Sequence, residues 1–219
     1  MFSSQFDGKT LDELIDYMLG IDQVTKPGEK YSYYNLGFGV IGKIIEKFSG
    51  MSFNDYLEQT MAKAGVYDVH EGKDRAGKRP NECVYYSQSG TNGYGNEMDV
   101  IAAAGGVIAS TAEMMKLLPQ IDGKDDIADI LKPETVEQMY TPSASYERYG
   151  LGWRLGHRLY PGAHYHSGNI AGTATIWCGD ANNGISAAIL CNSRSYLDGF
   201  DDNLYYLLGD IVAYYWPTM

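Results

Sequence analysis

The sequence is poor in basic residues. Its 17 lysines and arginines stand against 28 aspartates and glutamates, which gives a formal net charge of −11 at pH 7 and an isoelectric point near 4.7. A surface with this sign of charge repels the phosphate backbone of nucleic acids. The composition therefore argues against nucleic acid as a partner.

Long apolar runs are also missing. No segment of the sequence is long and apolar enough to cross a bilayer, so we predict no membrane span. The first seven residues lack the basic stretch followed by an apolar run that marks a secretory signal. We therefore expect a cytoplasmic location, and an export signal encoded in a longer natural gene is the alternative.

Cysteine is scarce, with Cys83, Cys178 and Cys191 in the whole chain. An odd number without C-x-x-C spacing favours reduced thiols over a disulfide framework. Cys178 and Cys191 fall on consecutive predicted strands, which leaves a bridge between them open. His164 and His166 alternate as a metal pair would, but no third ligand follows at a useful spacing, so we expect neither metal nor cofactor.

Helical signals fill the first two thirds of the chain, because apolar residues recur there every three or four positions between capping residues. The polar, glycine-rich stretch 71–96 is instead predicted to be a loop with a short strand at 84–86. The helix signals are a capping box at Thr10–Glu13, an apolar stripe over 36–48 ended by Gly50, a start at Ser52 with an end at Gly65, a second capping box at Ser110–Glu113 and a start at Pro133.

The pattern changes after Tyr149. Residues 173–178 and 185–190 are predicted strands, and the Asn- and Gly-containing residues 180–184 between them indicate a hairpin. A final helix is predicted from about Asp201 to Tyr215. A mostly helical region over 1–148, followed by antiparallel strands and a closing helix over 149–219, predicts an α+β fold in a single domain over 1–219.

Five motifs occur in an order that resembles one known family. They are Pro27-Gly28-Glu29 running through Tyr33-Tyr34-Asn35 to Gly50, the glycine-rich run from Ala104 to Met114, Tyr149-Gly150-Leu151-Gly152-Trp153, His166-Ser167-Gly168, and Cys191-Asn192. Together they resemble the class C β-lactamase-like family of penicillin-binding proteins, esterases, D-aminopeptidases and DD-peptidases. The resemblance implies the C-terminal portion of a β-lactamase/transpeptidase-like fold.

The resemblance also implies roles for particular residues. Tyr33 matches the tyrosine that takes a proton from the family's nucleophilic serine, and Asn35 matches the amide that holds the substrate. His166 matches a residue that donates toward the substrate carboxylate or the tyrosine. Ser167 and Gly168 match the substrate-binding strand, whose backbone contributes to the oxyanion hole. The implied substrate is a small molecule or peptide with a carboxylate or an ester.

The family's nucleophile motif is absent from this chain. None of its serines is followed three residues later by lysine, which removes the Ser-x-x-Lys nucleophile. Tyr34 also replaces the usual serine of the Tyr-Ser-Asn motif. We therefore expect a serine-hydrolase-like chain that is inactive alone and lacks an N-terminal part, which a partner chain or a second copy covers. The alternatives are a non-catalytic binding or interaction module of the same origin, and an unrelated α+β interaction protein.

Each candidate site residue also has an ordinary structural interpretation. A lone tyrosine such as Tyr33 most often packs in a core or at its rim. Asn35 precedes a helical stretch and is a good N-cap residue. Trp153 and Trp177 are expected to pack in the core rather than to bind substrate.

Overall fold

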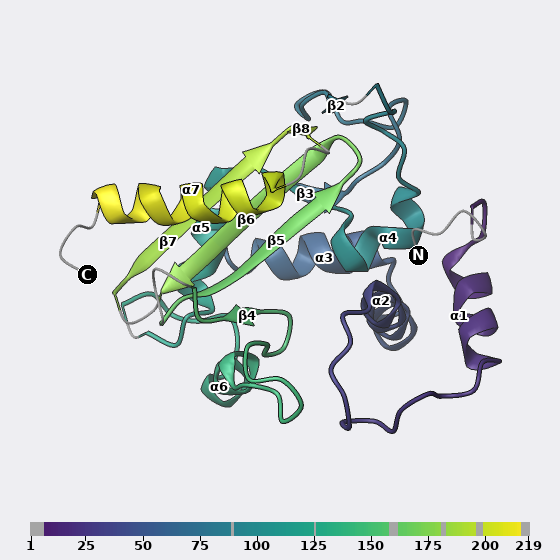
Figure 1. Cartoon of the computed structure of the whole chain (residues 1–219), viewed down its shortest axis with the longest axis horizontal. Coiled ribbons are helices and arrows are strands. Elements are labelled where there is room, and N and C mark those ends of the chain that lie inside the picture. Colours follow the sequence, from purple (N-terminus) through teal and green to yellow (C-terminus); the bar gives the residue numbers. More distant parts are fainter. Residues whose placement is uncertain are drawn as a thin grey trace.

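The computed structural model describes residues 7–88, 90–124, 126–157, 162–180, 183–195 and 199–215. It has the predicted α+β architecture, in which a four-stranded antiparallel sheet lies between one long C-terminal helix and a group of shorter helices (Figure 1). The α-helices are α1 Leu11–Leu19, α2 Asn35–Ser49, α3 Phe53–Ala62, α4 Met98–Gly105, α5 Thr111–Leu117, α6 Pro133–Tyr140 and α7 Phe200–Tyr215. The strands are β1 Val69–Glu71, β2 Tyr86–Ser87, β3 Val107–Ala109, β4 Arg154–Leu155, β5 His164–Ile170, β6 Thr173–Asp180, β7 Ile185–Cys191 and β8 Ser193–Arg194.

The main sheet has the strand order β4-β5-β6-β7, and all of its pairs are antiparallel. The predicted hairpin is confirmed, because β6 and β7 pair with Trp177 opposite Ala188. Residues 181 and 182 of its predicted turn lie outside the described residues. Strand β7 is at the edge of this sheet, while β1 with β3 and β2 with β8 form two small separate sheets.

The two faces of the sheet pack against different elements. The alternation of side chains along β6 shows which residues lie on each face. Ala174, Ile176 and Cys178 are buried against Leu204 and Leu208 of α7, which lies across this face (Figure 1). Successive strand residues point to opposite faces, so Thr175 and Trp177 point away from α7. Helix α5 packs beside β7 on that second side.

Helix α1 begins and helix α2 ends as the sequence predicts. The Thr10 hydroxyl accepts from the Glu13 amide, and the Glu13 carboxylate accepts from the Thr10 amide, which is the predicted capping box. Gly50 ends α2 in the left-handed conformation, with φ of 70°. Gly42 lets α2 approach α4 closely, because a Cβ at this position would lie 2.7 Å from the Cβ of Ala103.

Three predicted helix boundaries need correction. Helix α2 begins at Asn35 itself, with Tyr34 as the N-cap and no capping side chain, so Asn35 is not an N-cap. The box at Ser110 forms only in part. The Ser110 hydroxyl accepts from the Glu113 amide, but the Glu113 carboxylate binds Lys116 and the Tyr67 amide instead. Helix α3 ends at Ala62, before Gly65.

The segments between the predicted helices are more ordered than expected. Strand β1 extends into the predicted loop 71–96 and pairs with β3, while the short strand expected at 84–86 is found at Tyr86–Ser87. Helix α4 was not predicted. The three cysteines are free, and because Cys178 lies opposite Ala187 and Cys191 opposite Ala174, the pair is not bridged. Within the described ranges, we find no helix with the length and apolar character that crossing a membrane requires.

Candidate active site

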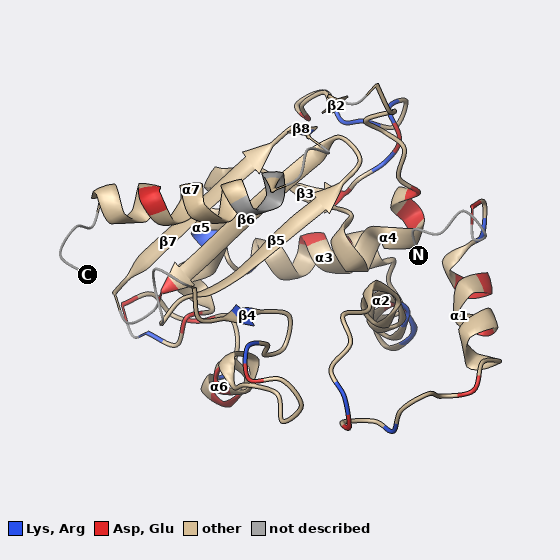
Figure 2. Cartoon of the chain, in the orientation of Figure 1, with Lys and Arg blue, Asp and Glu red and all other residues tan. Residues whose placement is uncertain are grey.

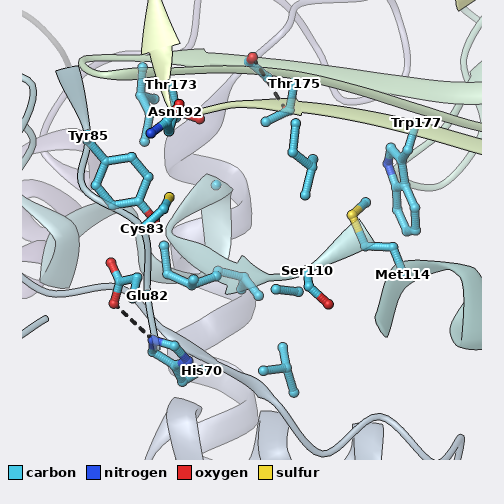
Figure 3. Close-up of a pocket in the computed structure, with 18 of the residues that line it drawn as sticks. His70, Glu82, Cys83, Tyr85, Ser110, Met114, Thr173, Thr175, Trp177 and Asn192 are labelled. Atoms are coloured by element: carbon cyan, nitrogen blue, oxygen red, sulfur yellow. Dashed lines mark hydrogen bonds and ion pairs between the residues drawn. The ribbon is translucent and has the colours of Figure 1, made fainter. Parts of the chain in front are cut away.

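A cavity of about 1050 Å³ lies between the sheet and the shorter helices. Thr173, Thr175 and Trp177 of β6 form one wall, and Ser110 and Met114 lie on the opposite wall (Figure 3). Most of the lining side chains are apolar, and they come from α3, α4, α5 and the three long strands. The cavity is therefore bounded by the helical part of the chain on one side and by the sheet on the other.

The structure brings all five sequence-predicted site residues to this cavity. Tyr33 in the loop before α2, Asn35 at the first position of α2, and His166, Ser167 and Gly168 on β5 all line it. The ring centroids of Tyr33 and His166 are 6.3 Å apart. The Tyr33 side chain is 48% exposed, so this hydroxyl is accessible at the rim of the cavity.

The strand register separates the side chains of β5. His166 is opposite Trp177 and Gly168 is opposite Thr175, so both lie on the cavity face of the sheet. Ser167 is opposite Ile176, and its side chain therefore belongs to the face covered by α7. Ser167 can consequently offer the cavity its backbone, whereas its hydroxyl is turned away.

Both ring nitrogens of His166 have hydrogen-bond partners. Nδ1 donates to the carbonyl of Ser167 at 2.8 Å, since a carbonyl oxygen can only accept. Nε2 of the neutral ring therefore accepts from the Tyr149 hydroxyl at 2.7 Å. Burial lowers the pKa of His166, and the positive charge of Arg154 lowers it further. The neutral ring has no free N–H for a substrate carboxylate, and the tyrosine that it contacts by hydrogen bond is Tyr149 rather than Tyr33.

A group of tyrosines surrounds this end of the cavity. Tyr31 stacks on Tyr146 with ring centroids 4.4 Å apart, and the Tyr33 ring meets Tyr149 edge-on at 6.5 Å. The guanidinium carbon of Arg154 lies 6.0 Å from the Tyr33 ring centroid, within the range of a cation–π contact. Arg154 is thus the cation next to the candidate base.

Three residues that line the same cavity have buried polar atoms without partners. Nε2 of His70 lies 3.2 Å from Oε2 of Glu82, and both side chains are buried (Figure 3). The other ring nitrogen of His70, the other carboxylate oxygen of Glu82 and the amide oxygen of Asn169 are buried without a hydrogen-bond partner. These atoms are inaccessible to solvent, and Asn169 is opposite Ala174, so its side chain lies on the face covered by α7 rather than in the cavity.

The cavity contains no activated serine among its lining residues. Ser110 and Ser167 are the serines that line it; the Ser110 hydroxyl caps α5 and the Ser167 side chain lies on the other face. In the part of the chain that the structure describes, no group of three or more His, Cys, Asp or Glu side chains could hold a metal. His164 does not join His166 in a metal site, because it packs between Tyr140 and Trp153.

Two residues of this arrangement were not assigned roles from the sequence. Tyr149 belongs to the Tyr-Gly-Leu-Gly-Trp motif, and Arg154 directly follows that motif. The motif was the available signal for both, although nothing in it indicates which of its side chains reaches His166. Trp153 is 5% exposed and packs on Trp177 in the core, as expected.

Comparison with known proteins agrees with this fold. The sequence model of the Beta-lactamase family matches residues 2–210. The N-acetylmuramyl-L-alanine amidase of Bacillus subtilis (strain 168) is 25% identical over 218 residues, covering 84% of this chain and 49% of the amidase. The octameric penicillin-binding protein homologue from Pyrococcus abyssi superposes with a TM-score of 0.73 at 25% identity, covering 93% of this chain and 48% of that chain.

A D-stereospecific amidohydrolase from Streptomyces sp. shares the fold, with a TM-score of 0.70 at 19% identity over 98% of this chain and 63% of that chain. The chain belongs to the β-lactamase family of serine hydrolases and penicillin-binding proteins. It spans between 39% and 49% of the length of the curated relatives that it matches.

Proposed function

We propose that this chain supplies the tyrosine, asparagine and histidine side of a serine-hydrolase site, and that it is inert toward β-lactams and activated esters by itself. The observation that carries this proposal is that Tyr33, Asn35 and His166 line one cavity in which no serine has a lysine one helical turn away. Serine, lysine and tyrosine act as a unit in this chemistry, so loss of one member removes most of the rate.

We further propose that a separate polypeptide segment carrying a Ser-x-x-Lys helix fills the cavity. An α-helix with its side chains is about 10–12 Å wide, and a volume of about 1050 Å³ suits a few turns of one. The apolar lining would cover the apolar side of such a helix.

In the completed site, Tyr33 would take the proton of the incoming serine. Arg154 would lie beside it, because its guanidinium carbon is 6.0 Å from the Tyr33 ring centroid. Asn35 would orient the substrate amide. Implied substrates are esters, amides or peptides with D-amino acids, and the site itself selects none of them. A second copy of this sequence cannot supply the segment, because none of its serines is followed three residues later by lysine.

The test measures acylation with and without a supplied nucleophile. The purified chain is incubated with a fluorescent penicillin and with p-nitrophenyl acetate, alone and with a peptide carrying the Ser-x-x-Lys helix of a β-lactamase-family enzyme. We expect no turnover and no covalent mass gain for the chain alone. With the peptide, we expect acylation of the peptide serine that is lost with a Ser→Ala peptide and reduced at least about tenfold by Tyr33→Phe.

Two results would contradict the proposal. Penicillin mass on Ser32 or Ser167 of the chain alone would show that this chain has its own nucleophile. Saturable penicillin binding without acylation in the presence of the peptide would instead favour the non-catalytic binding module.

A further inference from the structure

A second cavity, of about 600 Å³, lies beside β4 and is bounded by aromatic and cationic side chains. Its lining residues are Tyr146, Arg148, Arg154, Leu155, Gly156, His157, Tyr165 and Tyr205. Tyr165 is opposite Arg154 in the β4–β5 ladder, one residue before His166. The second cavity is therefore on the α7 side of β5, and the candidate active site is on the other side.

The two arginines of this cavity bring positive charge to a chain with a net charge of −11. Lys43, Lys73, Arg79 and Lys116 each bind a carboxylate of the chain. Arg148 and Arg154 have no such partner among the residues that the structure describes. Figure 2 shows the basic ribbon at β4 next to the strands of the sheet, which are uncharged except for the acidic end of β6.

The burial and the donor geometry of Arg154 also matter, in addition to its charge. Its side chain is half-buried, and Nε is buried without a hydrogen-bond partner. A guanidinium presents a planar set of donors that matches the two oxygens of a carboxylate, and an unpaired buried donor is costly. Arg154 thus lines the cavity with the planar donor set that matches an anionic ligand.

The remaining walls indicate what the anion is attached to. The His157 and Tyr205 rings stack with centroids 3.9 Å apart, and the Tyr165 and Tyr205 rings lie at 5.5 Å. Flat aromatic walls offer stacking surface to a planar group, and the volume is in the range of small-molecule sites. We propose that this cavity binds a small organic carboxylate with a planar or aromatic body, held at its carboxylate by Arg154 with Arg148 at the entrance.

Arg154 also lies over the Tyr33 ring, but binding at this site needs neither a serine nor a filled main cavity, so it is tested apart from the proposed hydrolase function. Its test is a binding titration of the chain with hippurate and with its neutral amide, hippuramide, at pH 7 and low ionic strength. We expect hippurate to bind at least about tenfold more tightly than hippuramide. Chemical-shift changes in the NMR spectrum are expected at Tyr165 and Tyr205, and not at Ser110 or Met114 of the main cavity.

Variants distinguish specific binding by Arg154 from nonspecific attraction of the ligand by positive charge. Arg154→Gln is expected to bring hippurate down to the affinity of hippuramide, while Arg154→Lys loses part of the preference, because lysine keeps the charge but not the planar fork. Arg75→Gln is the matched control, since Arg75 is exposed, lines neither cavity and carries the same charge. Equal affinity for hippurate and hippuramide, an equal loss in Arg75→Gln, or shifts confined to the main cavity would overturn the proposal. Saturable binding of phenyl phosphate without binding of hippurate would overturn the carboxylate as the ligand.

Discussion

The hydroxyl of Tyr149 lies 2.7 Å from Nε2 of His166, although the two residues belong to different motifs of the sequence. Burial raises the pKa of Tyr149 to about 12, so the hydroxyl keeps its proton at neutral pH and can donate it in a hydrogen bond. The bond holds the imidazole in one orientation on the cavity wall. Tyr149 is therefore a positioning residue for His166, while Tyr33 is left free at the rim.

Tyr149→Phe tests this relationship. A donor to Nε2 stabilises the neutral imidazole, so its removal is expected to raise the pKa of His166 toward its ordinary value. Loss of one buried hydrogen bond should also lower the free energy of unfolding by about 1–2 kcal/mol. The measurement is an NMR titration of the His166 ring protons in both proteins. Tyr33→Phe is the control, because its hydroxyl makes no hydrogen bond to His166, and an equal pKa change in both variants would disprove the positioning role.

The burial of His164 leads us to predict that the folded chain loses stability in acid. Burial lowers the pKa of His164 to about 4 from an ordinary value of 6.5. The unfolded chain therefore binds a proton that the folded chain rejects, and stability is complete above pH 6.5 and is lost as the pH falls toward 4. The loss from this one residue amounts to about 3 kcal/mol at most. Burial also lowers the pKa of His157 and His166, and these residues act in the same direction.

His164→Gln is the variant that isolates this effect. It is expected to reduce the difference in the free energy of unfolding between pH 7.5 and pH 4.5, measured by urea denaturation. The absolute stability of the variant is not the readout, since the ring also packs on Tyr140 and Trp153. A variant with the same pH dependence as the parent would show that His164 does not carry the acid sensitivity.

We predict that the β5–β6 turn requires glycine at position 172. Gly172 has φ of 76°, and a Cβ there would lie 2.2 Å from the carbonyl oxygen of Gly93 in a distant loop. Gly172→Ala is expected to destabilise the fold by roughly 2 kcal/mol or more, through backbone strain and displacement of the loop. Thermal unfolding followed by circular dichroism measures the loss.

Gly37→Ala on α2 is expected to have the opposite effect on stability. No atom lies within 4 Å of a Cβ built at Gly37, and the residue is in a helix. Alanine is expected to stabilise the chain by about 0.5–1 kcal/mol here, because glycine loses more backbone entropy on folding. If both glycine variants changed the unfolding temperature alike, the contact between Gly172 and Gly93 would not matter for stability.

Local sequence signals predicted the elements whose residues interact with near neighbours. The Thr10 capping box, the Gly50 helix end, the β6–β7 hairpin and the C-terminal helix all depend on residues within a few positions of each other. Helix α4 was missed because its Met-Asp-Val-Ile-Ala-Ala-Ala-Gly sequence is short and nearly uniformly apolar, which leaves no helical periodicity to detect. Strands β1 and β3 pair Val69 with Ala109, and no local pattern specifies such a distant partner.

The site was predictable to the extent that motif order reflects the fold. The order of the motifs predicted that Tyr33, Asn35 and His166 share a cavity, and they do. Hydrogen-bond partners were not predictable in the same way. The sequence could not indicate that Tyr149 would occupy Nε2 of His166, or that Glu113 would bind Lys116 and Tyr67 in place of closing its capping box. These choices depend on tertiary packing, which brings competing donors and acceptors together.

Cys83 is a natural labelling site in the main cavity. It lines that cavity and is exposed, whereas Cys178 is buried and has its pKa raised to about 11 by burial. Thiol reagents react with the thiolate, so they should modify Cys83 well before Cys178. An environment-sensitive dye on Cys83 would then sense the arrival of any segment in the cavity, and its fluorescence could follow assembly in real time without an engineered cysteine.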